Sequence, residues 1–394
     1  MATTVDLLHG PYTATVGPRA HVESFVWHTY AVVLAATMLV VGLIWDISWH
    51  MSIGRDTFWT PAHLLIQGGG LLAGLSSGAI ALNTTFRGSD DAKQSSVRFW
   101  GFRAPYGAWV CVLGCGAMLT SAPFDDWWHG AYGLDVRIVS PPHILLGIGM
   151  MAIVLGAMLR TLALQNGDEE RIRSRAALMF AWSSGLFITI LGTLLLEWSD
   201  RGYMHLGTFY IAWGISVPIV LVGTTVSGRS RWPAATAALI YMTVLALTSW
   251  ILMLFPATPK LGPIYRDITH FVPLDFPILL VFPALAIDLT WRRVREWPVL
   301  RASAALGIAF MLTLMLVQWP FSSFLMANGR NWFFHTDNFV YWQDIASEHF
   351  SFQFYAQADD APPLIVQFAY SIVAAVIASL VGLLRGRWMT RVRR

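Results

Sequence analysis

Long apolar runs separated by short polar connections occupy most of the chain. A helix needs about 20 apolar residues to cross the hydrocarbon core of a bilayer. By that length the sequence predicts ten spanning helices, near 24–45, 61–83, 104–123, 141–165, 174–197, 203–226, 232–255, 273–291, 298–318 and 362–384. The eighth range contains Pro273, Pro277 and Pro283. These prolines predict a kinked or broken helix whose freed carbonyls need partners within the protein.

Composition agrees with this reading of the pattern. Of the 394 residues, 56% are hydrophobic and 12% are charged, whereas a soluble domain carries about 25% charged residues. The fold class is therefore an all-α integral membrane protein. The net charge of +3 comes largely from arginines near the ends of spans, so we expect no nucleic-acid partner. The first 23 residues contain no apolar core, and we expect no cleavable signal peptide.

Basic residues set the expected orientation in the membrane. They gather in every second connection and in the tail, at 87–103, 171–175, 229–231, 292–301 and 385–394. By the positive-inside rule both termini are then cytoplasmic, in the inner membrane of the cell. We divide the chain into a cytoplasmic segment (1–23), a four-helix unit (24–165), further membrane helices (166–318), an extracytoplasmic loop (319–361) and a last helix with a basic tail (362–394).

A pattern of metal-binding residue types occurs twice at the predicted outer ends of the spans. An aspartate and a histidine four residues apart end one span, and a second histidine opens the next. The two copies are Asp46, His50 and His63, and Asp125, His129 and His143. Residues at i and i+4 lie on one face of a helix, one turn apart. The returning histidine can close a three-ligand site against them.

The two copies also share their surroundings. Each returning helix begins with proline just before its histidine, and proline suits the first turn of a helix. Spans one and two and spans three and four therefore predict a parallel repeat of two helix hairpins. Asp56 and Asp135 are further candidates in the two turns. Because Arg55 and Arg137 stand close to them in sequence, an ion pair is at least as good an account as a ligand role.

Imidazole and carboxylate ligands suit zinc, copper, iron and nickel, and the ligand types alone do not choose among these metals. Three protein ligands with an open position favour a reactive site over a closed structural one. The alternative for a single ionisable residue at the end of a span is contact with water at the interface.

The segment from Trp49 to His63, WHMSIGRDTFWTPAH, resembles the hallmark segment of the C subunit of copper-containing membrane monooxygenases. That family oxidises methane, ammonia or short-chain hydrocarbons. Its Asp-x3-His-x12-His copper site matches Asp46, His50 and His63. Its second site, Asn-x3-His-x13-His, has the spacing of the second copy, with Asp125 where the family has asparagine. The resemblance covers about a third of the chain, and nothing beyond about residue 170 aligns with the family.

The resemblance implies a copper-binding membrane subunit that oxidises a small apolar substrate with dioxygen. The orientation predicted from the basic residues places its metal sites toward the periplasm. It also implies other membrane and periplasmic subunits, assembled as trimers. Iron or zinc remains open. The alternatives are a copper-handling or copper-delivery protein without redox turnover, and an electron-transfer protein whose haem lies between two histidines. A zinc hydrolase is a weaker alternative because the helical His-Glu-x-x-His pattern is absent from the sequence.

Other candidate residues have a simpler reading beside the functional one. Cys111 and Cys115 are expected to be packed, and His28 lies too deep in its span to reach His50. His205 fits either role. The outer loop carries polar residues that form either a further metal site or a solvated loop, with the second reading preferred: His335, Asp337, Asp344, Glu348 and His349.

Overall fold

The computed structural model describes residues 18–133, 140–167, 170–196, 201–327, 331–336, 339–344 and 362–393. Within these ranges the chain is almost entirely helical, and nine helices are long and apolar enough to cross a membrane. The strands that it contains form a small hairpin, β1 (Val97–Phe99) with β2 (Phe102–Ala104). The prediction of an all-α membrane protein is confirmed.

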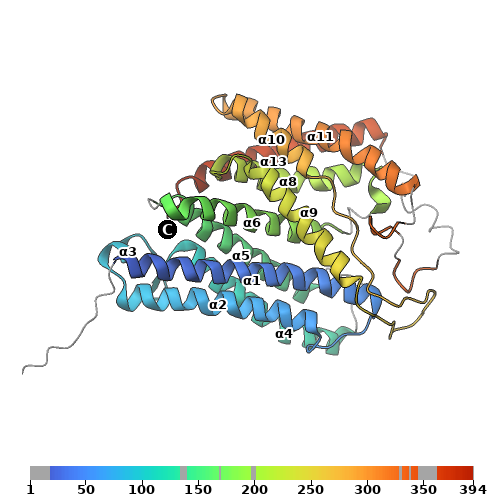
Figure 1. The fold of residues 1–394 in the computed structure, drawn as a ribbon, viewed down its shortest axis with the longest axis horizontal. Coiled ribbons are helices and arrows are strands. Elements are labelled where there is room, and N and C mark those ends of the chain that lie inside the picture. The colour runs from blue at the N-terminus through green and yellow to red at the C-terminus, as the bar shows by residue number, and fades with distance from the viewer. Residues whose placement is uncertain are drawn as a thin grey trace, which may run out of the picture.

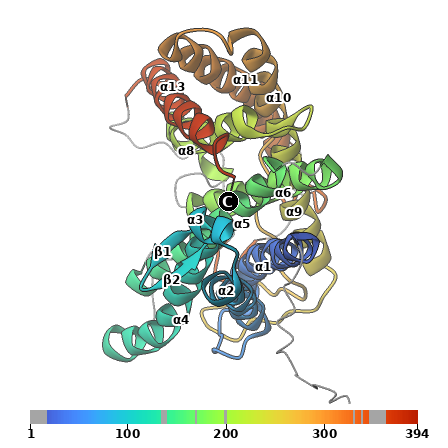
Figure 2. The same cartoon turned by 90° about the vertical axis from the view of Figure 1, so that its left-hand side faces the viewer.

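Four long helices form the half of the molecule that carries both predicted metal patterns. They are α1 (Pro18–Ser52), α2 (Pro61–Arg87), α4 (Tyr106–Tyr132) and α5 (Pro141–Gln165), and the short α3 (Asp90–Gln94) and the β-hairpin lie between α2 and α4. α1 packs along α2, α4 packs along α5, and α2 joins the two pairs through α4. Figure 2 shows α1, α2 and α4 together at one end of the molecule.

A glycine brings the two helices of each pair close together at a matched position. A Cβ atom on Gly69 would lie 2.9 Å from the carbonyl oxygen of Ala35, and one on Gly149 would lie 2.8 Å from that of Gly114. Each glycine follows the histidine of its own hairpin by six residues, and each carbonyl precedes the aspartate by eleven. Small residues allow such close helix contacts in membranes. The two hairpins therefore use the same close contact at the same distance from their metal patterns.

The second half of the molecule contains the remaining long helices. They are α6 (Glu170–Leu194), α8 (Gly207–Ser227), α9 (Pro233–Leu252), α10 (Val281–Val294), α11 (Val299–Ala327) and α13 (Leu364–Met389), with a 3-10 turn, η1 (Arg201–Tyr203), before α8. α8 packs against α13, and α11 packs against α10 and α13. α6 contacts both α5 and α9 and so joins the two halves. Figure 1 shows the long helices running in broadly similar directions, with α9 inclined to the rest.

The eighth predicted span is not a continuous helix. Its first part, 273–280, is irregular chain, and the helix that follows, α10, has only 14 residues. In the irregular part the Ile278 amide donates to the Tyr241 hydroxyl (3.3 Å) and the Leu279 amide donates to Gln318 Oε1 (3.0 Å). The prediction of a kinked or broken segment is confirmed, and the groups partnered in these two hydrogen bonds are backbone amides. Nine of the ten predicted spans are full-length helices among the described residues, and the eighth is irregular chain followed by the short α10, because Pro273 and Pro277 prevent a full-length helix.

Candidate metal centres

The first predicted metal pattern lies at the end of α1 and the start of α2. α1 continues to Ser52, so Asp46 and His50 occupy its last turns rather than the connection after it. Their i, i+4 spacing places both side chains on one face of the helix. α2 begins at Pro61, and His63 is its third residue. The chain between the helices folds back over a short turn.

This turn orients the ring of His63. The Thr57 amide donates to Thr60 Oγ1, and the Thr60 amide donates to the Thr57 carbonyl, both at 2.9 Å. The same carbonyl lies 2.9 Å from His63 Nδ1. When Nδ1 carries the proton and donates to this carbonyl, Nε2 presents its lone pair on the other side of the ring. A backbone acceptor on the second ring nitrogen is the usual way in which a metal-binding histidine is oriented.

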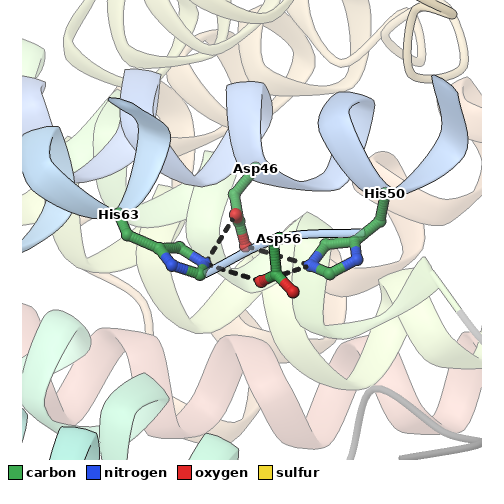
Figure 3. A group of neighbouring side chains, drawn as sticks. All are labelled: Asp46, His50, Asp56 and His63. Atoms are coloured by element: carbon green, nitrogen blue, oxygen red, sulfur yellow. Dashed lines mark ion pairs between the residues drawn. The ribbon is translucent and has the colours of Figure 1, made fainter. Parts of the chain in front are cut away.

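Four side chains meet at this point (Figure 3). His63 Nε2 lies 3.0 Å from Asp46 Oδ1 and 3.3 Å from Asp56 Oδ2. His50 Nε2 lies 3.5 Å from Asp56 Oδ2 and 4.0 Å from Asp46 Oδ2. One donor atom from each residue lies within 4.8 Å of the others. The predicted ligands Asp46, His50 and His63 are therefore brought together, and Asp56 joins them.

The spacing of these atoms fits a shared metal ion. Two donors that are each about 2.1 Å from one ion lie about 3–4 Å apart when the angle between them is roughly 90–140°. The four contacts span 3.0–4.0 Å. Asp46 Oδ1 is buried, and His63 Nε2 faces it at 3.0 Å. Two carboxylates this close repel each other unless a positive charge lies between them, so a divalent cation suits the site.

The second predicted pattern has the same local construction. Asp125 and His129 lie in the last turns of α4, and His143 is the third residue of α5. His129 Nδ1 lies 3.0 Å from the carbonyl oxygen of Gly133, which directs Nε2 toward the aspartate. Asp125 Oδ1 lies 3.5 Å from His129 Nε2 and 3.6 Å from His143 Nε2. The three predicted residues are brought together here as well.

The two clusters share an unusual feature of their carboxylates. Asp125 Oδ1 is buried, as Asp46 Oδ1 is. In both clusters this oxygen faces a histidine nitrogen. A buried acceptor normally has a partner, and a cation bound in each cluster would be one.

The clusters differ in a fourth donor. Asp56 lies on the histidines of the first cluster, and no ion pair joins it to Arg55 within the described part of the chain. From the sequence, an ion pair with Arg55 was at least as good an account of Asp56 as a ligand role, and the geometry favours the ligand role. The corresponding candidate in the second turn, Asp135, lies outside the described residues.

The remaining candidates do not join either cluster. His28 precedes Asp46 by 18 residues, which is about 27 Å of helix. Cys111 faces Gly156 on α5 and Cys115 faces Gly74 on α2, so the two thiols point to different helices and pack as expected. His205 is 4% exposed, and its Nε2 lies 3.0 Å from Ser323 Oγ.

The reading of the outer loop as solvated is wrong for His335. This residue is 2% exposed, and its Nδ1 lies 2.7 Å from the carbonyl oxygen of Leu274. Burial by the irregular chain before α10 was not visible in the sequence. Asp337, Glu348 and His349 lie outside the described residues.

Comparison of the chain with protein-family models, with curated proteins and with solved structures finds no match. The assignment of a function therefore depends on the residues and their geometry.

Proposed function

We propose that the chain is a copper-binding membrane subunit of a monooxygenase-like complex that oxidises a small apolar substrate with dioxygen. The observation that supports it best is the double convergence of one aspartate and two histidines at the outer ends of two hairpins. In each case a buried carboxylate oxygen faces imidazole nitrogens. The resemblance of residues 49–63 to the copper monooxygenase subunit supports the choice of reaction.

Copper suits the donor set. Imidazole nitrogens with carboxylate oxygens bind several divalent metals, and copper binds most tightly in the general order of affinities. Asp46, His50, Asp56 and His63 would hold the first ion, and Asp125, His129 and His143 the second. Bound copper would supply the redox chemistry that lets dioxygen attack a C–H or N–H bond.

The protein side chains have separate tasks in this proposal. The two aspartates of the first cluster neutralise the charge of the ion, and the Thr57 carbonyl fixes the ring of His63. Phe58 and Trp59 lie in the same turn, between Asp56 and His63, and contact each other edge to face, with ring centroids 5.2 Å apart. Both rings are mostly exposed, at 52% and 73%. They offer an apolar surface beside the site that suits an apolar substrate.

We also propose that the two hairpins are a parallel repeat and that both metal sites face the periplasm. The matched contacts of Gly69 and Gly149 support the repeat. The alternation of basic connections supports cytoplasmic termini in the inner membrane. Assembly with other membrane and periplasmic subunits, as trimers, follows from the resemblance alone.

A copper-delivery protein without turnover is the second candidate. The His50 side chain is 46% exposed, and an exposed ligand favours exchange of the ion with a partner. A haem held by two histidines fits less well, because His50 and His63 both contact Asp46 and Asp56. These contacts direct the two rings toward carboxylates rather than toward separate faces of a porphyrin.

The test is incorporation of labelled oxygen. The copper-loaded protein, purified with the subunits that accompany it, is given ¹⁸O₂, a reductant and a panel of small hydrocarbons and ammonia. We expect ¹⁸O in an oxidised product, and no product from the His63→Ala variant. Copper binding without labelled product from any substrate would contradict the monooxygenase proposal and favour delivery.

A further inference from the structure

The face of α1 opposite the first metal cluster is attached to the second half of the molecule. Ser48 and Ser52 each follow a ligand by two residues, about 200° around the helix. Ser48 Oγ donates to the carbonyl of Val272 (2.6 Å), and the amide of Val272 donates to Ser52 Oγ (2.7 Å). Both serines are fully buried, and Val272 is 1% exposed. Two adjacent side chains thus satisfy both backbone groups of one residue more than 200 positions away.

The segment that contains Val272 contacts the metal-binding turn at further points. We call residues 256–280, between α9 and α10, the strap. The Lys260 amide donates to the carbonyl of Ile53 (2.9 Å), at the start of the turn. The Phe271 ring lies 5.9 Å from that of Trp49, between centroids. The strap therefore touches both the end of α1 and the turn that carries Asp56.

The far end of the strap is fixed to the helices of the second half. The amides of Ile278 and Leu279 donate to side chains of α9 and α11. The Leu274 carbonyl lies 2.7 Å from Nδ1 of the buried His335. The strap is thus held at both ends, and its hydrogen bonds connect the end of α1 to the helices of the second half.

The second cluster has no equivalent attachment among the described residues. The positions that follow Asp125 and His129 by two residues are Trp127 and Ala131. Trp127 is 57% exposed, and Ala131 is exposed as well. The two clusters therefore resemble each other in their ligands and differ in the support behind them.

We propose that the strap is a brace for the first metal centre and that Ser48 and Ser52 are its positioning residues. This inference rests on the metal-binding part of the proposed function. Without the two hydroxyls, the buried amide and carbonyl of Val272 lose their partners, which is costly in a dry environment. The strap or the end of α1 must then shift. Because Asp46 and His50 share that helix end, such a shift moves them away from His63.

The test measures copper affinity in a protein that keeps only the first site. His129→Ala and His143→Ala together provide this background. Ser48→Ala with Ser52→Ala is then compared with Ser184→Ala, which removes a buried hydroxyl bonded only within its own helix. Copper is titrated against a competing chelator, and the Cu(II) paramagnetic resonance spectrum is recorded. We expect the double serine variant to bind copper at least about tenfold more weakly, as for other residues that orient ligands, with altered hyperfine splitting.

The Ser184→Ala control should match the background in affinity and spectrum. Equal affinity and an identical spectrum in the double serine variant would overturn the brace while leaving the metal site in place. No copper in the unmodified background would overturn the metal site and with it the brace. If the double variant does not fold, Ser48→Ala alone, which retains Ser52, is judged by the same two measurements.

Discussion

Gly54 provides a sharp test of the geometry of the first site. It lies two residues beyond the end of α1 with φ of +82°, and its amide donates to the carbonyl of Trp49 (3.3 Å). An alanine at this position has two penalties. A left-handed backbone costs an L-residue about 1–2 kcal/mol. The added Cβ would also overlap the Tyr341 hydroxyl, with Tyr341 Cζ at 2.9 Å, and overpacking of this kind costs about 1–3 kcal/mol.

The two penalties together amount to about 2–5 kcal/mol. The turn can avoid them by changing its path, but Asp56 is two residues away and would leave the cluster. Copper binding must then restore the strained turn, so the penalty appears as weaker binding. Since about 1.4 kcal/mol is a tenfold change, Gly54→Ala should weaken copper binding at the first site by about 30-fold or more.

The assay is a copper titration in the background that lacks His129 and His143. Burial raises the pKa of the Tyr341 phenol, so the hydroxyl remains a neutral group against Gly54. With Tyr341→Ala the overlap disappears, and Gly54→Ala should then cost only about 5- to 30-fold. Gly78→Ala is the matched control, because a Cβ there meets no atom within 4 Å. Unchanged copper affinity in both backgrounds would refute the account of the turn.

Three further predictions concern single carboxylates. Asp56→Asn should weaken copper binding at the first site by about tenfold or more, as measured by competition with a chelator. An unchanged affinity would show that Asp56 is not a ligand. Asp125→Asn should weaken the second site through the loss of negative charge and leave the first site intact, with metal content after dialysis as the readout. Asp288→Ala should lower the free energy of unfolding by about 3 kcal/mol or more without changing the metal content of the protein. In that variant one hydroxyl and two amides, at 2.6–3.3 Å from the carboxylate, lose their acceptor; an unchanged unfolding temperature in detergent would contradict this.

Much of the fold was predictable from apolar length alone. Each of the nine long helices corresponds to a predicted span, because in a bilayer the backbone must satisfy its own hydrogen bonds and length then determines structure. The prolines of the eighth span correctly predicted a break. The sequence did not indicate that the chain before α10 is irregular and buried, because its partners Tyr241 and Gln318 lie on other helices.

The candidate site was predictable where it depends on local geometry. The i, i+4 pairs on α1 and α4 and the prolines before His63 and His143 sufficed to place the six ligand candidates in two groups. The role of Asp56 as a ligand was harder to predict from the sequence, because a turn has no fixed periodicity. An ion pair with the neighbouring Arg55 was at least as good an account of this residue. The brace was not predictable, because Val272 is 220 residues from Ser52 in sequence. Only the folded chain brings them together.

Metal stoichiometry is the measurement that tests the central claim most directly. The protein is purified in nanodiscs, loaded with copper, freed of excess ion and analysed by mass spectrometry, alongside His50→Ala, His129→Ala and the double variant. Two metal-binding clusters predict about two ions per chain, one ion in each single variant and none in the double variant. Equal metal content in all four folded proteins, or no metal in the unmodified chain, would contradict the claim that the two clusters bind metal.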